Sequence, residues 1–290
     1  MTDRPRAARR LWQLLEPVHA VTYFSPEPLA ALTAAGYRGF WMGYFAGRAA
    51  PLGPVGPDVV LPLFHNFAPA HVARALPDAW SFAPPEHALS ARLEGSVAAL
   101  RRILGPAADD PGLRRAADLA YDAACSAPTA GRALFTANLA LPVPAEPLPR
   151  LWHAATLLRE HRGDGHVKVL VDEGVDGRTA HVLHALTTGI PAEVYAAARR
   201  LGPAEWASIL DDLATRGLVA GGLLTDAGRA LKTRVEDRTD ELAATAYAAV
   251  PDAEIDELTQ LLRPLTRAVV AAGDIPAKSP MGLDLQGLAD

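Results

Sequence analysis

The segment from residue 189 to residue 273 restricts the fold more than any other part of this 290-residue chain. Apolar residues at helical spacing predict one helix over residues 191–201 and a second over residues 203–216, with a Gly-Pro turn between them. The apolar stripe expected to be buried on the second helix consists of Trp206, Ile209, Leu210 and Leu213. Two helices joined by so short a turn predict a helix-turn-helix.

The residues that follow predict a small hairpin and a long helix. Gly217 is placed to end the second helix, and residues 218–224 fit two very short strands around a Gly-Gly turn. Thr225 caps a long helix that runs to about residue 247, and Asp252 starts the last helix. Helix, turn, helix, small wing and long helix is the order of a winged helix-turn-helix.

The first half of the chain differs in composition. Twelve of the 18 aromatic residues fall between Trp12 and Phe82. Residues 37–50 predict a helix that is aromatic on most faces and therefore buried. Four prolines within residues 141–149 predict a stiff, extended connector. We expect a mainly α fold with an aromatic-rich helical domain over residues 1–140, the connector over 141–150, and a winged-helix domain with long C-terminal helices over 151–290.

Charge and targeting signals narrow the class of partner. Lys and Arg total 28 against 33 Asp and Glu, and the net charge of −5 argues against a generally basic nucleic-acid coat. No uncharged apolar run approaches about 18 residues, and the arginine-rich start is not followed by an export signal's apolar run and cleavage site. The single cysteine cannot form an internal disulfide. We expect a cytoplasmic protein with no membrane partner.

The C-terminal order resembles the MarR family of winged-helix regulators, through residues 216–219 before the wing and 224–231 after it. The whole chain is similar to an actinobacterial, MarR-like helix-turn-helix family of unassigned activity. The segments that carry this second resemblance are residues 16–24 (EPVHAVTYF), 43–53 (GYFAGRAAPLG), 158–166 (LREHRGDGH) and the wing. MarR proteins are typically dimers that bind DNA and small aromatic or lipophilic effectors, so the resemblance implies a homodimer with these partners.

The outward face of the second helix nevertheless lacks the donors with which a helix reads DNA. With the apolar stripe buried, its outward positions are Ala204, Glu205, Ala207, Ser208, Asp211, Asp212, Thr215 and Arg216. Three acids stand against one base, and the wing residues 220–223 include no Arg or Lys. Arg199 and Arg200 could touch the DNA backbone, but two cations are too few for ordinary affinity. DNA as a partner is disfavoured, and a winged helix reused as a packing or dimerisation scaffold explains the same residues.

Residues 159–166 form the densest polar cluster. His161, Asp164 and His166 are candidate acid/base residues, with Arg159 and Arg162 as candidate ligand-binding residues. The sequence also fits a plainer interpretation, in which a helix over residues 151–161 ends at the Arg-Gly-Asp-Gly turn and its charges simply cap it. A short apolar stretch, residues 167–173, would follow. The spacing matches no strong zinc signature, so we expect no metal site.

Glu16, His19 and Tyr23 share one helix face because they are three and four residues apart. A histidine on an apolar helix is usually a satisfied core residue, but a carboxylate one turn away favours a tuned imidazole. We therefore interpret His19 and Glu16 as candidate catalytic residues and Tyr23 as a candidate ligand-binding residue.

The aromatic first third fits either a well-packed core or a flat apolar pocket with a few polar groups. For the pocket, the candidate ligand-binding residues are Trp41, Tyr44, Arg48, His65 and Asn66. The leading hypothesis is a small-molecule-binding protein with a degenerate helix-turn-helix and acid/base chemistry on a small organic metabolite between the two domains. The alternative is a ligand-responsive, DNA-binding regulator. The sequence identifies no cofactor and does not decide whether the protein is an enzyme.

Overall fold

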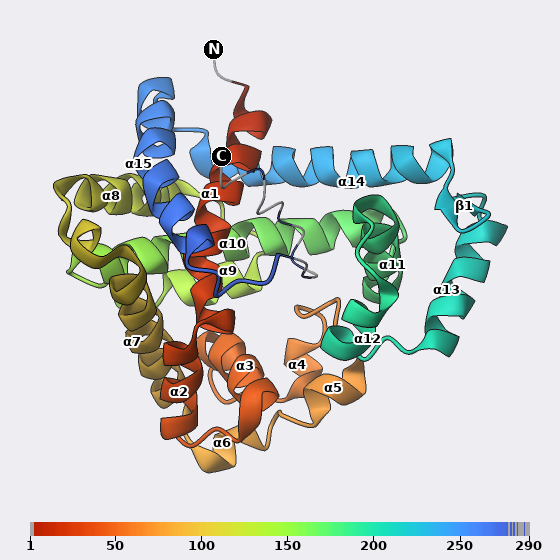
Figure 1. The fold of residues 1–290 in the computed structure, drawn as a ribbon, viewed down its shortest axis with the longest axis horizontal. Coiled ribbons are helices and arrows are strands. Elements are labelled where there is room, and N and C mark those ends of the chain that lie inside the picture. The colour runs from red at the N-terminus through yellow and green to blue at the C-terminus, as the bar shows by residue number, and fades with distance from the viewer. Residues whose placement is uncertain (1–2, 278, 280, 282, 284–286, 288–290) are drawn as a thin grey trace.

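The computed structural model describes residues 3–277, 279, 281, 283 and 287. The described chain is helical apart from one two-stranded sheet, which confirms the expected mainly α class (Figure 1). No described helix is both long enough and apolar enough to cross a membrane. The first helices are α1 (Arg4–Phe24), α2 (Pro26–Ala34), α3 (Gly39–Ala49), η1 (Ala50–Leu52), α4 (Pro57–Val60), α5 (Pro69–Ala73) and α6 (Ala79–Phe82). They are followed by α7 (Pro85–Leu104), η2 (Gly105–Asp109), α8 (Pro111–Ser126), α9 (Ala133–Leu139) and α10 (Pro147–Asp172).

The winged helix-turn-helix forms as its local signals predict. Its elements are α11 (Gly177–Thr188), α12 (Ala192–Arg199), α13 (Pro203–Thr215), β1 (Val219–Ala220), β2 (Leu223–Leu224), α14 (Asp226–Ala244), η3 (Thr245–Tyr247) and α15 (Asp252–Ala271). The strands pair antiparallel, and the turn between them places Gly221 at φ +57° and Gly222 at φ +76°, where glycine carries no Cβ penalty. The Thr225 side chain accepts a hydrogen bond from the Gly228 backbone and so caps α14.

Helix α10 contradicts the expectation of a turn at residues 162–165. The Arg-Gly-Asp-Gly sequence lies inside one continuous 26-residue helix, and the apolar stretch after it is the last part of the same helix. A side chain at Gly165 would place its Cβ 2.8 Å from Arg132 Nη1, so this glycine allows a close approach between neighbours. α10 crosses the middle of the molecule beneath α14 (Figure 1).

Three apolar cores hold the fold together. The largest is built from α1, α7, α8, the first half of α10 and α15, so it joins both ends of the chain. A second, aromatic core lies around α3, α4 and α5, and a third lies within the winged helix around α11, α13 and α14. The proline-rich connector separates helices along the sequence, whereas the largest core continues across it.

Two helices are less buried than the sequence indicates. On α3, Phe45 is buried but Phe40 is 42% exposed and Trp41 and Tyr44 are half-buried, because this helix turns one face toward a cavity. On α13, Leu213 is buried while the other three residues of the apolar stripe are only half-buried.

Candidate functional site

A cavity of about 800 Å³ lies where the three cores meet. Its walls come from α1, α3, the segment 63–67, α10 and, in the winged helix, α11, α12 and α14. Leu134 of α9 and three residues beyond α15, namely Pro276, Ser279 and Met281, also belong to the described lining. The structure brings eleven of the thirteen candidate residues to this cavity: Glu16, Tyr23, Trp41, Tyr44, Arg48, His65, Asn66, Arg159, Arg162, Asp164 and His166. The two exceptions, His19 and His161, lie behind the wall.

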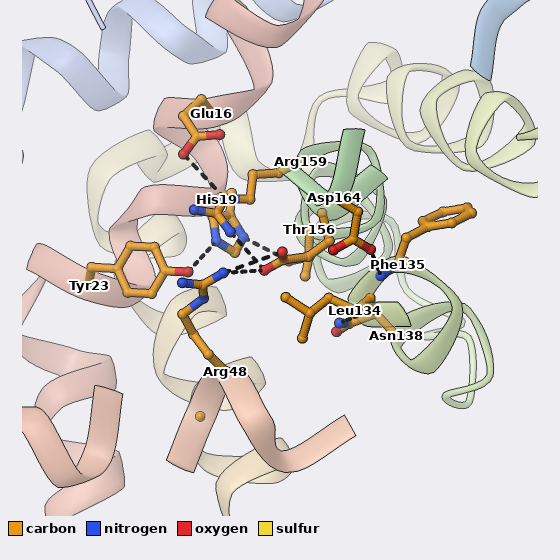
Figure 2. A network of polar contacts seen from close by, with 12 residues as sticks. Glu16, His19, Tyr23, Arg48, Leu134, Phe135, Asn138, Thr156, Arg159 and Asp164 are labelled. Atoms are coloured by element: carbon orange, nitrogen blue, oxygen red, sulfur yellow. Dashed lines mark hydrogen bonds and ion pairs between the residues drawn. The ribbon is translucent and has the colours of Figure 1, made fainter. Parts of the chain in front are cut away.

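A buried carboxylate organises the arginines of one wall. Glu160 receives Arg159 Nη1 at 2.8 Å and Arg48 Nη2 at 3.4 Å, and Arg159 Nε also lies 3.5 Å from Glu16 Oε1 (Figure 2). Burial raises the pKa of Glu160, but Arg159 and Arg48 outweigh it and hold that pKa below its ordinary value. Sequence reasoning did not select Glu160, although it lies inside the polar cluster of α10. Its charge fixes two guanidinium groups at the cavity surface.

Tyr23 reaches the cavity as the end of a hydrogen-bond chain (Figure 2). The Thr156 hydroxyl donates to the Trp152 carbonyl at 3.0 Å, so it can only accept from His19 Nδ1 at 2.9 Å. This fixes the proton on Nδ1, and the Tyr23 hydroxyl therefore donates to His19 Nε2 at 2.9 Å. Burial, followed by Arg159, lowers the pKa of His19, and burial raises the pKa of Tyr23. Tyr23 thus presents oxygen lone pairs, and no free proton, to a ligand.

His166 on α10 is held in the same way by a threonine of α14. Thr239 donates to the Val235 carbonyl at 2.7 Å, so His166 Nδ1 donates to the Thr239 hydroxyl at 2.9 Å. Its Nε2 is left as an acceptor and forms no hydrogen bond with the rest of the described chain. Burial lowers the pKa of His166 to about 4, against the opposing charge of Glu236. The imidazole is therefore neutral at pH 7.

His161 and Asp164 do not form the pair that a turn would allow. The His161 ring packs edge-on against Phe135, with centroids 5.0 Å apart, and lines a separate crevice of about 10 Å³. Asp164 instead accepts a hydrogen bond from the Phe135 backbone amide at 3.0 Å and so caps α9 from outside. Burial raises the pKa of Asp164 to about 6. The two side chains are three residues apart on the continuous α10, and both contact Phe135 of α9 instead of each other.

His65 and Asn66 fasten the aromatic wall to the winged helix. His65 Nε2 donates to the Val175 carbonyl at 3.3 Å, and His181 Nε2 donates to the Asn66 carbonyl at 3.0 Å. The approach is so close that a Cβ at Gly177 would lie 1.9 Å from the His65 carbonyl oxygen. His65 and Asn66 line the cavity, and their segment also packs against the start of α11.

The outward face of α13 is exposed at every position expected from the sequence. Three of its four charges are paired: Glu205 lies 2.7 Å from Arg178, and Asp212 lies 3.6 Å from Arg216. Arg199, a candidate for contact with a DNA backbone, is turned inward instead. Its guanidinium lies 4.5 Å from the centre of the Phe67 ring and lines the cavity. The surface available to DNA is therefore poorer in cations than the sequence indicates.

Fold and site together define a helix-turn-helix protein whose winged helix forms part of the wall of the cavity. A model described as a helix-turn-helix family matches residues 8–276, and the protein belongs to this family. Searches of the curated proteins and of the solved structures found no match. The family match runs from within α1 to beyond α15, so it includes most of the cavity lining as well as the winged helix.

Proposed function

We propose that the protein binds a small organic molecule in the cavity between its aromatic helices and its winged helix. The cavity itself carries the proposal. At about 800 Å³ it has the size of a ligand site, and its wall combines aromatic rings with a few buried polar groups. A cavity of this kind gives a flat organic molecule an apolar surface and fixed hydrogen-bonding partners.

Ligand binding is tested by filling the cavity from α12. Ala198 lines it, whereas the neighbouring Ala197 is exposed. We expect Ala198→Trp to weaken binding of the neutral fluorophore N-phenyl-1-naphthylamine about tenfold or more, because the indole occupies the ligand's volume. Ala197→Trp, the matched control, should leave the affinity unchanged. Titration followed by fluorescence measures both, and equal affinities in the two variants would place the probe outside the cavity.

The finer part of the proposal is acid/base chemistry on the bound molecule. Tyr23 and His166 support it, because both line the cavity and each has a hydrogen-bond acceptor available there. In each case a hydrogen bond to a neighbouring residue fixes the position of the proton. His19 acts only through Tyr23 and is a positioning residue. Native mass spectrometry and an absorbance spectrum of the purified protein test for a co-purified molecule. Recovery of that molecule in chemically altered form after incubation would support turnover.

The second candidate is a ligand-responsive regulator that binds DNA, which membership of a helix-turn-helix family favours. The resemblance to dimeric MarR-type regulators belongs to this candidate. Against it stand the acidic outer face of α13 and a wing without Lys or Arg. A gel-shift assay with the DNA upstream of the protein's own gene distinguishes the two candidates. Tight, salt-dependent binding supports the regulator. No shift at any salt concentration supports a winged helix that only forms part of the cavity wall.

A further inference from the structure

The cationic side chains that line the cavity are paired with carboxylates in the described part of the chain, with one exception. Five cationic side chains in its described lining have a carboxylate within 4.0 Å: Arg9, Arg48, Arg159, Arg162 and Lys232. Arg199, the sixth, has no carboxylate partner among the described residues. Its hydrogen bond runs to the carbonyl of the adjacent Ala198 at 3.0 Å.

Arg199 is half-buried, and part of its guanidinium group lacks any hydrogen-bond partner in the described chain. Its Nε is shielded from solvent and finds no hydrogen-bond acceptor in the described part of the chain. Burial, with smaller contributions from Arg48 and Arg159, lowers the pKa of Arg199. A guanidinium group keeps its charge in a protein, so this part of the cavity wall carries a positive charge that no carboxylate of the described residues neutralises.

A half-buried cation that lines a cavity without a carboxylate partner is stabilised by an anion that enters the cavity. We infer that the ligand is an organic anion whose oxyanion group binds Arg199, with its flat body against Trp41, Tyr44 and Phe67. The three rings lie together beside Arg199, with centroids of Tyr44 and Phe67 5.6 Å apart and of Trp41 and Phe67 6.1 Å apart. This inference rests on the proposed function and adds the charge class of the ligand.

The position of Arg199 gives this charge a second consequence. Arg199 is the last residue of α12, the first helix of the helix-turn-helix, whereas the aromatic rings belong to the N-terminal half. An anion bound between them links α12 to α3 and the segment around Phe67. The winged helix is thereby coupled to occupancy of the cavity.

Two fluorophores with the same aromatic skeleton test the inference. 8-Anilinonaphthalene-1-sulfonate carries an oxyanion, and N-phenyl-1-naphthylamine does not. We expect Arg199→Gln to weaken binding of the sulfonate about tenfold or more and to change binding of the neutral amine less than about twofold. Arg200→Gln removes the same charge from the exposed neighbouring residue and should change neither.

The outcomes separate the two proposals. If wild-type protein binds both probes and Arg199→Gln changes neither, or weakens both equally, the anion site is wrong while ligand binding stands. If wild-type protein binds neither probe, the proposed function itself fails. Where the sulfonate binds through Arg199, displacement by 1-naphthoate or by 1-naphthyl phosphate identifies a carboxylate or a phosphate as the preferred group.

Discussion

Threonine hydroxyls determine the tautomers of two histidines: His166, which lines the cavity, and His19, which lies behind its wall. Thr156 and Thr239 each donate to the carbonyl four residues earlier in their own helix, which leaves only an acceptor for the histidine. The spacing of Glu16, His19 and Tyr23 correctly places them on one helix, but it gives no indication of Thr156, which lies 137 residues from His19. Tautomers are therefore set by contacts between helices that no local pattern reveals.

At the same scale, His161 should make the protein sensitive to acid. Burial lowers its folded pKa to about 3 from an ordinary 6.5, so below pH 6.5 the unfolded chain takes up a proton that the folded chain refuses. The stabilisation is complete above pH 6.5 and is lost as the pH falls toward 3. Between pH 6.5 and pH 4 we expect His161→Leu to lose less unfolding free energy than wild type, by up to about 3 kcal/mol.

Urea unfolding at both pH values measures this difference. His87→Leu, at an exposed histidine, is the control and should keep the wild-type pH dependence. An identical pH dependence in wild type and His161→Leu would show that His161 is protonated in the folded protein.

Among the elements, the helix-turn-helix was predictable and α10 was not. A capping threonine, a Gly-Gly turn and helical spacing are local signals, and the structure confirms the elements that they predict. The two glycines at 163 and 165 also look like a turn in the sequence. In the structure Gly165 is instead packed beneath Arg132, which donates to the His161 and Leu242 carbonyls. The sequence alone does not distinguish a glycine that makes room for a neighbouring side chain from a glycine that forms a turn.

Alanine substitutions at these two glycines should have opposite effects. A Cβ at Gly163 would meet only Glu160 Oε2, at 3.8 Å, so Gly163→Ala should stabilise the protein by about 0.5–1 kcal/mol through the helix backbone. A Cβ at Gly165 would displace Arg132, so Gly165→Ala should destabilise it by about 1–3 kcal/mol. Urea unfolding followed by circular dichroism measures both. Destabilisation by both substitutions would argue that residues 162–165 form a turn.

At the scale of the whole molecule, local sequence patterns predict the order of the helices and strands but not the contacts between the N-terminal helices and the winged helix. Eleven of the thirteen candidate residues share one cavity, because aromatic and charged residues embedded in apolar sequence mark its wall. Arg199 was considered only for contact with a DNA backbone, whereas it lines the cavity, and Glu160 was not selected. Both residues were missed for one reason: the N-terminal helices and the winged helix meet through contacts that have no local sequence signature.

The shared core predicts one unfolding event. α1 and α15 lie in the same apolar core, and Arg9 and Arg162 both pair with Asp240 on α14. We expect scanning calorimetry to show a single transition whose calorimetric and van't Hoff enthalpies agree, because neither half retains its core without the other. Two resolved transitions would instead mean that the halves on either side of the proline-rich connector are thermodynamically independent.

The continuous α10, about 39 Å long, has a consequence for how such proteins diversify. It begins within the proline-rich connector, passes along the cavity and ends in the winged helix. The winged helix therefore cannot be exchanged by recombination as a self-contained cassette, because its replacement would remove one wall of the cavity. In this architecture a change of ligand and a change in the winged helix must be acquired together, residue by residue.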